Sequence, residues 1–523
     1  MGTSLLNFYE NKIKPQWKFA FGSTFLIALL IHLYKFSNTL LNHDSLFNFY
    51  SDQNVVGSGR WFLSVACGIS SYFDLPWVIG LLSIIYIALT VVVIIELFQI
   101  KNPIVIMLIG GLMAAFPGIT ETFFFEFTAD GYMLAMLLSA LAVYSSNFEH
   151  TGWKATLLSI IFVCLSCGIY QAYVSFALLL TLFYFVNELL ENRRTNQECR
   201  KYIMRQILIY AAGMILYYVI WKICMAIQGV EVNHNQGIDE VSNLTGISFS
   251  PTWLTRGVVN CIKTLYLFFM EWNVFEHELT LYAALNILFI VVFFAALLIA
   301  AYKSGLFRRK IHLLLTVLSL ALCVPCAGIW HFASEGVGYR PMMLQSLSLL
   351  YIYGAILFDR WFKSRFSNIA GILLAIIIFN NIIIANISYY YMDKAYEQSY
   401  ATGLEMTMRI HDMETEYNFD KIAVVGERTK AVSIEVSSEE AQHIHMMSQL
   451  LETDLLYDRI HVQLFLENIF HMSNSFATSA ECESLEKQSE ILEMETWPST
   501  DSMQVINGML VIKIGDIDDG EVN

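Results

Sequence analysis

The chain has 523 residues, of which 56% are hydrophobic and 15% charged, and its mean hydropathy is +0.52. A soluble core of this length does not need so large an apolar fraction, so a purely soluble fold is excluded. The formal net charge of −15 is local, because the chain from Ile387 onward holds 26 acidic and 8 basic residues. This balance argues against nucleic acid as a partner and against attraction to anionic lipid by bulk charge.

The first apolar segment follows Lys12, Lys14 and Lys18 and extends to about Tyr34. No small-residue cleavage site follows it, so we interpret it as an uncleaved first span. Ten further segments are long enough to cross a hydrocarbon core of about 30 Å. The sequence therefore predicts about eleven transmembrane helices, at residues 17–34, 75–98, 102–117, 127–146, 153–170, 173–190, 203–227, 278–302, 311–329, 341–358 and 367–388. The pair on either side of Tyr170-Gln171 leaves a single broken helix as an alternative.

Positive charges occur in every second loop and are nearly absent from the others. Short cytoplasmic loops of membrane proteins retain Lys and Arg. The loops predicted to be cytoplasmic contain Lys12, Lys101, Lys154, Arg193, Arg308 and Arg360. The N-terminus is therefore predicted on the cytoplasmic side of the membrane, and an odd number of spans places the C-terminal domain on the other side.

Three exterior loops are long or polar, at about 35–74, 228–277 and 330–340. An extracytoplasmic reaction site would be built from these loops. In the second loop, Ser250-Pro251 signals the start of a helix. One face of that helix is apolar and another carries cations, which favours a helix lying in the membrane interface.

The chain is predicted to divide into a membrane domain, residues 1–388, and a soluble acidic α/β domain, residues 389–523. Strand-like runs occur at Lys421–Gly426 and Met509–Ile514, with a helix predicted at about 438–451. This smaller domain contains no glycine-rich phosphate loop, no nucleophile elbow and no clustered metal ligands. We therefore expect it to have a supporting role.

The segment Asn42-His43-Asp44-Ser45 opens the first exterior loop directly after the first span. A carboxylate at this height meets both a lipid-linked substrate and a polar acceptor, so Asp44 is a candidate general base. The alternative is a solvated loop aspartate or a helix N-cap.

Arg60, in Gly57-Ser58-Gly59-Arg60-Trp61, is one of few cations in the exterior loops. A guanidinium near the interface suits a phosphate or diphosphate leaving group. Arg256, Lys263 and Arg340 are further candidates for binding a donor phosphate. The alternative for Arg60 is an interfacial anchor beside Trp61.

Glu126 and Asp130 lie four residues apart near the exterior start of the fourth span, after Glu121. On a regular helix they share one face, and acids at that depth tend to face a cavity. They are candidate catalytic carboxylates. The alternative is an acid at a helix start, stabilised by the helix dipole.

Polar and aromatic residues also gather where other spans meet the exterior. Tyr170-Gln171 interrupts an apolar run, and His331, Glu335, Tyr339 and Arg340 crowd the loop before the tenth span. These groups are predicted to line one substrate cleft with His43. Taken singly, each also fits an ordinary interfacial residue.

The order and spacing of these features resemble the bacterial and phage glucosyltransferase (Gtr-type) family of O-antigen serotype conversion. The shared pattern is an acid after span one, a Gly-x-Gly-Arg some fifteen residues later, an aromatic and acidic stretch opening span four, and a Tyr-Gln in the fifth. The resemblance covers about residues 15–390.

This resemblance implies an α-helical polytopic GT-C glycosyltransferase. Such an enzyme moves a hexose, as a rule glucose, from a polyprenyl-phosphate donor to a cell-envelope glycan on the outer face of the membrane. It also implies roles for Asp44, Arg60, Asp130 and Gln171. The sequence departs from the family in its first loop, where a single acid follows His43 in place of adjacent acids. That departure does not favour a two-carboxylate or metal-dependent mechanism, although the sequence names no cofactor and leaves a divalent metal open.

Three other classes of protein stay open. A lipid-linked glycan flippase or polysaccharide polymerase would also be polytopic, but would favour charges inside the bundle over acids at its exterior rim. A secondary transporter would show inverted repeats or helices broken at mid-membrane, and no clear repeat is visible. The third class is an accessory subunit without chemistry.

Overall fold

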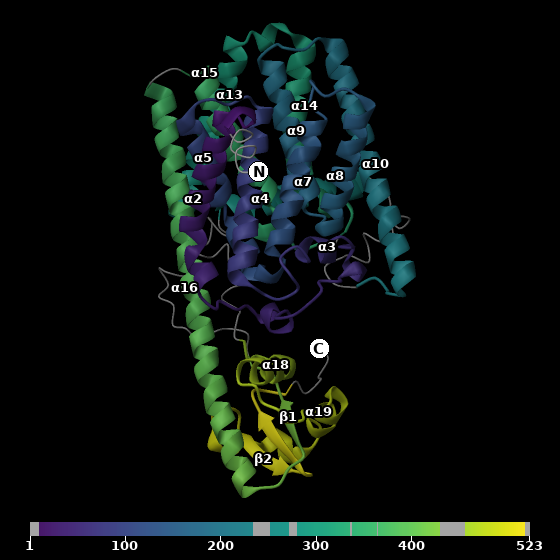
Figure 1. Ribbon diagram of the computed structural model, residues 1–523, viewed down its shortest axis with the longest axis vertical. Coiled ribbons are helices and arrows are strands. Elements are labelled where there is room, and N and C mark those ends of the chain that lie inside the picture. The colour runs from purple at the N-terminus through teal and green to yellow at the C-terminus, as the bar shows by residue number, and fades with distance from the viewer. Residues whose placement is uncertain are drawn as a thin grey trace. The chain divides into compact units, whose positions relative to one another are not determined.

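The computed structural model describes residues 10–233, 251–270, 280–334, 337–362, 365–428 and 455–517. These residues form two compact units (Figure 1). The large unit comprises residues up to Ser37 and residues 51–386. The small unit comprises residues 38–50 together with the chain from Ile387 onward. The predicted helix at 438–451 and the predicted cleft residue Glu335 lie outside the described residues.

The large unit is built of helices throughout its described part. Its longer helices are α2 (Pro15–Ser37), α4 (Pro76–Leu97), α5 (Pro103–Ala114), α7 (Ala129–Ser145), α8 (Trp153–Ile169), α9 (Tyr173–Leu190), α10 (Asn196–Gln228), α12 (Pro251–Met270), α13 (Leu281–Lys303), α14 (Lys310–Ala327) and α15 (Ser348–Trp361). Its short elements are η2 (Val56–Ser58), α3 (Leu63–Cys67), α6 (Pro117–Thr122), η3 (Phe123–Thr128), η6 (Leu306–Arg308), η7 (Ile329–Phe332), η8 (Pro341–Met343) and η9 (Gln345–Leu347). Helix α16 (Arg365–Glu416) starts in the large unit and contributes its second part to the small unit.

Eight helical segments in the described ranges are long and apolar enough to cross a membrane. They are Pro15–Ser37, Pro76–Leu97, Pro117–Ser145, Tyr173–Leu190, Asn196–Gln228, Leu281–Lys303, Lys310–Ala327 and Arg365–Glu416. Helices α5 and α8 are apolar but shorter, and α15 has 14 residues. The structure thus confirms a mostly helical, multi-span protein, while the number eleven stays a prediction.

Proline determines where many of these helices begin. Six of the eight prolines stand at the first position of a helix, at residues 15, 76, 103, 117, 251 and 341. The ring sets φ for a helix, and the missing N–H is one that the first turn leaves unbonded. The span predicted at about 127–146 contains α7, and the short elements α6 and η3 extend the same candidate span back to Pro117.

The break at Tyr170-Gln171 separates two helices. Helix α8 ends at Ile169, and Tyr170 is extended with φ −156° and ψ 118°. Helix α9 begins at Tyr173. The alternative of one broken helix is therefore set aside.

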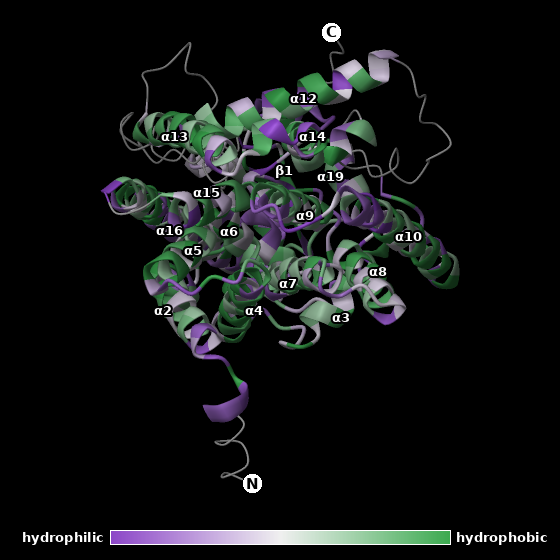
Figure 2. Cartoon of the chain, turned by 90° about the horizontal axis from the view of Figure 1, so that it is seen from above, coloured by the Kyte–Doolittle hydropathy of each residue, from purple (hydrophilic) through white to green (hydrophobic). Residues whose placement is uncertain are grey.

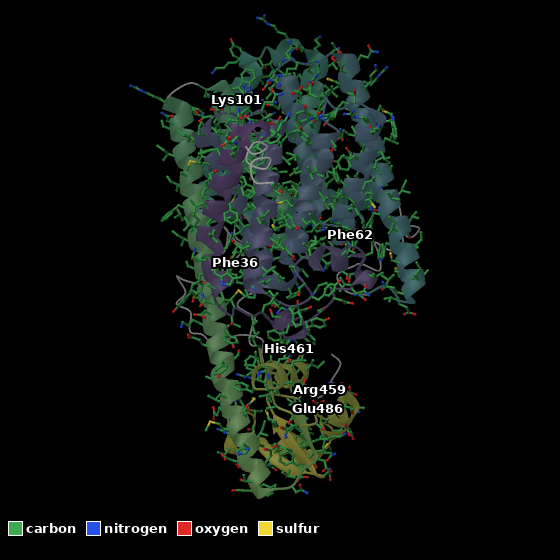
Figure 3. All side chains as sticks on the ribbon, in the orientation of Figure 1. Phe36, Phe62, Lys101, Arg459, His461 and Glu486 are labelled. Carbon is green, nitrogen blue, oxygen red and sulfur yellow. The ribbon has the colours of Figure 1, made fainter. Side chains whose placement is uncertain are left out.

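The loops that were predicted to be cytoplasmic contact one another at one end of the large unit. Their contacts are Lys14 with Glu96 at 2.6 Å, Arg194 with Glu149 at 2.6 Å, Arg309 Nη1 with the carbonyl of Leu189 at 3.0 Å, and Lys303 with the carbonyl of Trp361 at 2.8 Å. Lys101 marks this end in Figure 3. We call it the Lys101 end.

The loops that were predicted to be exterior meet at the opposite end, where Figure 3 shows Phe36 and Phe62. Their contacts are the amide of Phe62 with the carbonyl of Gly168 at 2.8 Å, Gln171 Nε2 with the carbonyl of Ser58 at 2.7 Å, and Trp221 Nε1 with the carbonyl of Val56 at 2.8 Å. We call this the Arg60 end. The loops joined by these contacts thus lie at opposite ends in agreement with the charge pattern.

The helices at the rim of the large unit expose apolar side chains. Figure 2 shows α10 and α13 there as largely hydrophobic. On these helices Ile215 is 64% exposed and Leu298 is 62% exposed. Apolar surface on this scale is unfavourable in water and suits contact with lipid.

The small unit contains a three-stranded sheet in the order β1-β3-β2, formed by β1 (Lys421–Val425), β2 (Met503–Ile506) and β3 (Met509–Lys513). Strand β1 pairs in parallel with β3, and β2 pairs with it antiparallel. The remaining elements are η1 (His43–Phe47), α18 (Arg459–Ile469), α19 (Ser479–Leu485), α20 (Ser489–Glu493) and η11 (Thr500–Ser502). Both predicted strands are present, and β2 was not predicted.

Alternate residues of the sheet enter two separate cores. Ile422 and Val424 pack with α16 and α18 on one face, whereas Ala423 and Val425 pack with α19 and α20 on the other. Covering both faces explains the continuous apolar run of β1. The first of these cores also contains Leu41 and Leu46 of the first exterior loop.

Candidate functional site

The loop that carries Arg60 is held by Gln171. Residues Val56–Ser58 form η2, and Gly59 follows in the left-handed region with φ 78°. The side-chain amide of Gln171 donates to the carbonyl of Ser58 at 2.7 Å. A Cβ atom at position 59 would overlap that amide and lie 2.5 Å from the hydroxyl of Tyr217. Only glycine fits this backbone conformation and this space.

The Arg60 guanidinium lies against two stacked tyrosines. Its Nη1 donates to the hydroxyl of Tyr132 at 2.9 Å. Its Cζ lies 4.6 Å from the centre of the Tyr170 ring. The rings of Tyr132 and Tyr170 stack with their centres 4.6 Å apart. The cation is therefore held in one orientation by a hydrogen bond and a cation–π contact, and Tyr132 is a site residue that the sequence analysis missed.

A second cation of this end, Arg340, has its Cζ 5.8 Å from the centre of the Phe125 ring. Arg60, Arg340 and Glu121 all interact electrostatically with the hydroxyl of Tyr170. Glu121 is buried and accepts a hydrogen bond from the amide of Met342, two residues after Arg340. The charges of two guanidinium groups and one acid therefore act on Tyr170, and Arg60 is the one in direct contact with its ring.

The predicted cleft residues Tyr170 and Gln171 are brought together with Arg60, but they differ in what they can do. The Gln171 amide nitrogen donates to the Ser58 carbonyl and contacts the hydroxyl of Tyr217 at 3.0 Å. Because this amide is occupied, Gln171 supports the loop of Arg60, whereas Tyr170 contacts the cation directly.

Asp130 lies in the first turn of α7 and is buried. Its Oδ1 accepts from the amide of Gly131 at 2.8 Å. Ser70 and Cys67 lie beside the same carboxylate. The structure therefore places Asp130 against small polar groups of the first exterior loop.

Glu126 forms an ion pair with Lys35, and both side chains are almost completely buried. Asp74, just before α4, interacts electrostatically with both groups. Burial raises the pKa of the Asp74 carboxyl to about 7, with the charge of Glu126 adding to the effect and Lys35 opposing it. Lys35 and Asp74 were missed, although a lysine at the exterior end of a span departs from the usual charge distribution and so carried a signal.

The expected shared helical face of Glu126 and Asp130 is wrong. Residues Phe123–Thr128 form a 3-10 turn in which Phe125 has φ −99° and ψ 58°. The α-helix begins only at Ala129. A 3-10 turn has three residues per turn, so the two carboxylates point to different partners.

Asp44 and His43 belong to the small unit. They lie in η1, where Asn42 caps the turn by accepting from the amide of Ser45 at 2.9 Å. Asp44 has 46% of its side chain exposed and lies 3.5 Å from His43 Nε2. Its carboxylate is thus accessible to solvent, unlike those of Glu126 and Asp130.

Three residues at the start of α18 form a polar cluster beside Asp44. Asp458 Oδ1 accepts from His461 Nδ1 at 2.7 Å, and the hydroxyl of Tyr457 lies 3.3 Å from His461 Nε2. Burial raises the pKa of Tyr457 to about 12, and the charges of Asp458 and Asp44 add to this effect. Sequence analysis missed this cluster because its residues lie more than 400 positions from Asp44 in the chain.

Helix α12 places its cations away from its packed face. Gly257 and Cys261 are buried against the region of η7, whereas Arg256 and Lys263 are exposed. His331 in η7 accepts or donates a hydrogen bond with Thr264 at 2.8 Å, and burial lowers its pKa. These three predicted residues therefore share one region around α12, whose exposed cations face outward from the packed side.

An apolar pocket of about 380 Å³ lies between α9, α12, α13, α14 and the start of α15. Its lining includes Leu179, Leu265, Phe269, Phe293, Val324 and Leu347. No charged side chain is among the lining residues in the part of the chain that the structure describes. The pocket can hold a hydrocarbon chain but offers nothing to a polar sugar.

Within the described ranges, no three His, Cys, Asp or Glu side chains gather in a metal-binding arrangement.

A family model described as Glucosyl transferase GtrII matches residues 33–358. The match covers more than half of the chain and includes Arg60, Asp130 and Tyr170. No curated protein and no solved structure matches the chain. The resemblance expected from the sequence is thereby confirmed.

Proposed function

Because the chain belongs to the glucosyl transferase GtrII family, we propose that it moves a hexose, glucose by preference, from a polyprenyl-phosphate donor to an envelope glycan on the outer face of the bacterial membrane. The observation that supports this proposal is the guanidinium group of Arg60, which Tyr132 and the ring of Tyr170 hold in one orientation.

The Arg60 end supplies an anion clamp for the donor phosphate. Arg60 is oriented by Tyr132 and by the ring of Tyr170, so little conformational freedom is lost when a phosphate binds. The leaving phosphate gains negative charge as the bond from the sugar C1 to its oxygen breaks, and preorganised cations stabilise that charge. Arg256 and Lys263 on α12 are further cations for this role.

The apolar pocket supports a lipid-linked donor. Leu347 in its wall follows Arg340 by two short 3-10 turns, η8 and η9. Each CH₂ group moved from water into such a pocket contributes about 0.8 kcal/mol. We propose that the polyprenyl chain lies in this pocket and among the neighbouring apolar helices.

The acceptor hydroxyl needs a base. Its oxygen forms the new bond to C1 while its proton passes to a carboxylate. Asp44 is the most accessible of the candidate acids, at 46% exposure, whereas Glu126 is 4% exposed and bound to Lys35. We propose Asp44 for this role and keep Asp130 as the competing assignment.

Membranes containing the chain, incubated with radiolabelled polyprenyl-phosphate glucose, are expected to transfer label to envelope polymer. Translocation of the labelled donor without transfer would favour the flippase alternative. A reporter active only outside the cytoplasm and fused after Asn523 tests the outer-face assignment, and an active fusion there is expected.

A further inference from the structure

A cationic cavity lies at the Lys101 end, away from the proposed reaction site. It has a volume of about 680 Å³ and lies between the start of α10 and the start of α14. Four cations line it, namely Arg193, Arg194, Arg309 and Lys310. No carboxylate is among the lining residues in the described part of the chain.

Two of the four cations are paired with acids that do not line the cavity. Arg193 pairs with Glu191, and Arg194 pairs with Glu149 and Glu188. These pairs fix the two guanidinium groups in place. The net positive charge of the cavity lining therefore comes from the other two cations.

Arg309 and Lys310 have no carboxylate within 4.0 Å among the ion pairs of the described chain. The Arg309 guanidinium donates instead to neutral oxygens, at 3.0 Å to the carbonyl of Leu189 and at 2.7 Å to Asn192 Oδ1. Burial lowers the pKa of Arg309. A partly buried cation with only neutral partners is stabilised when an anion enters beside it.

The backbone adds to the positive potential of the cavity. Helix α10 starts at Asn196 after its cap Thr195, and helix α14 starts at Lys310. Both starts line the cavity. A capping box of Thr195 and Glu198 already closes the start of α10, whereas the start of α14 has no side-chain cap. The partial positive charge and unbonded N–H groups at the start of α14 therefore favour phosphate oxygens.

Apolar surface continues from the cavity along the same two helices. Ile311 and Leu314 of α14 are 53% and 58% exposed, and Met204 and Leu208 of α10 are 62% and 56% exposed. A free phosphate makes no use of such surface. An anionic phospholipid uses both parts, with its phosphate in the cavity and its acyl chains against the helices.

We propose that this cavity binds the phosphate headgroup of an anionic phospholipid, with its acyl chains against the exposed faces of α10 and α14. The proposal does not depend on the transferase assignment. It concerns a local site, so the acidic charge of the whole chain does not oppose it.

The test uses the purified full-length chain in detergent, titrated with phosphatidylglycerol or phosphatidylcholine, with bound lipids counted by native mass spectrometry. We expect phosphatidylglycerol to bind more tightly. Lys310→Gln is expected to weaken that binding by about five-fold, since one cation near a membrane surface contributes about 1 kcal/mol. Lys310→Glu should weaken it further. Lys310 is exposed and starts a helix, so neither change removes a buried contact.

Arg308→Gln is the matched control, because Arg308 is exposed and adjacent but does not line the cavity. An equal loss in Arg308→Gln would replace the site with diffuse surface charge and overturn the proposal. Unchanged binding in Lys310→Glu would also overturn it. A third contrary result is complete displacement of the lipid by millimolar inorganic phosphate, which would identify a site for free phosphate.

Discussion

Replacing Gly59 with alanine should reduce both the activity and the stability of the protein. The residue has φ 78°, a conformation that costs an L-residue about 1–2 kcal/mol. The new Cβ would also displace the Gln171 amide, which donates to the Ser58 carbonyl at 2.7 Å and contacts the Tyr217 hydroxyl at 3.0 Å. Two neutral hydrogen bonds contribute about 1–3 kcal/mol together, so the total cost is about 2–5 kcal/mol.

The loop can relieve this strain only by moving, and Arg60 is the next residue. A displacement of about 1 Å at a positioning group costs about 100-fold in rate. The assay is transfer of labelled glucose to polymer at saturating donor, together with the unfolding temperature of the purified chain. We expect a rate loss of about 100-fold with a modest decrease in that temperature.

Gly229 provides the matched control. It has φ 65°, and a Cβ atom there would meet nothing within 4 Å. Gly229→Ala therefore carries the backbone strain without the overlap, and it should retain most of the activity. Equal activity in both variants would refute the argument that Gln171 and Gly59 together position Arg60.

Three further predictions concern the carboxylates and the cation. Asp44→Asn keeps the size of the side chain and removes its proton-accepting charge, so the rate of glucose transfer should decrease by about 100-fold to 10,000-fold. Asp52→Asn is the nearby control. Near-normal transfer in Asp44→Asn together with an inactive Asp130→Asn would assign the base to α7. Arg60→Gln should raise the donor concentration needed for half-maximal rate or abolish activity, and Arg60→Lys should restore only part of it because the planar contact with Tyr170 is lost. Burial raises the pKa of Asp74 to about 7, so the folded state binds its proton more tightly than the unfolded state does. The stability of the chain should therefore decrease as pH rises from about 4 to about 7. Unfolding temperatures measured at several pH values should show this dependence in the unchanged chain and not in Asp74→Asn.

The sequence by itself determined the protein class and most of the helices. Eleven apolar segments each contain a helix in the structure, and the alternation of Lys and Arg among the loops agrees with which loops meet at each end. These features depend on hydrophobicity, chain length and charge, which act locally along the chain. The strands at 421–425 and 509–513 followed from short apolar runs for the same reason.

The sequence also pointed to Arg60 and Tyr170, because both interrupt their surroundings in an unusual way. Only the tertiary structure decided that they are partners, since their contact joins residues 110 positions apart. The contact also depends on Gln171, which holds the loop just before Arg60. The tertiary structure likewise decided that Lys35 of α2 pairs with Glu126 of η3. The hydrophobic periodicity of one segment cannot predict contacts between distant residues. The prediction from helical spacing was also wrong near Phe125, where a 3-10 turn stands in place of the regular helix that would align Glu126 with Asp130.

The placement of Asp44 shows the limit most clearly. Its position after the first span suggested a residue of the membrane domain, yet Leu41 and Leu46 on either side of it are buried in the core of the small unit. That core forms from segments more than 350 residues apart. Its apolar contacts are non-directional, so many apolar segments could cover the exposed face of the sheet. The sequence contains no local signal for which distant segment does so.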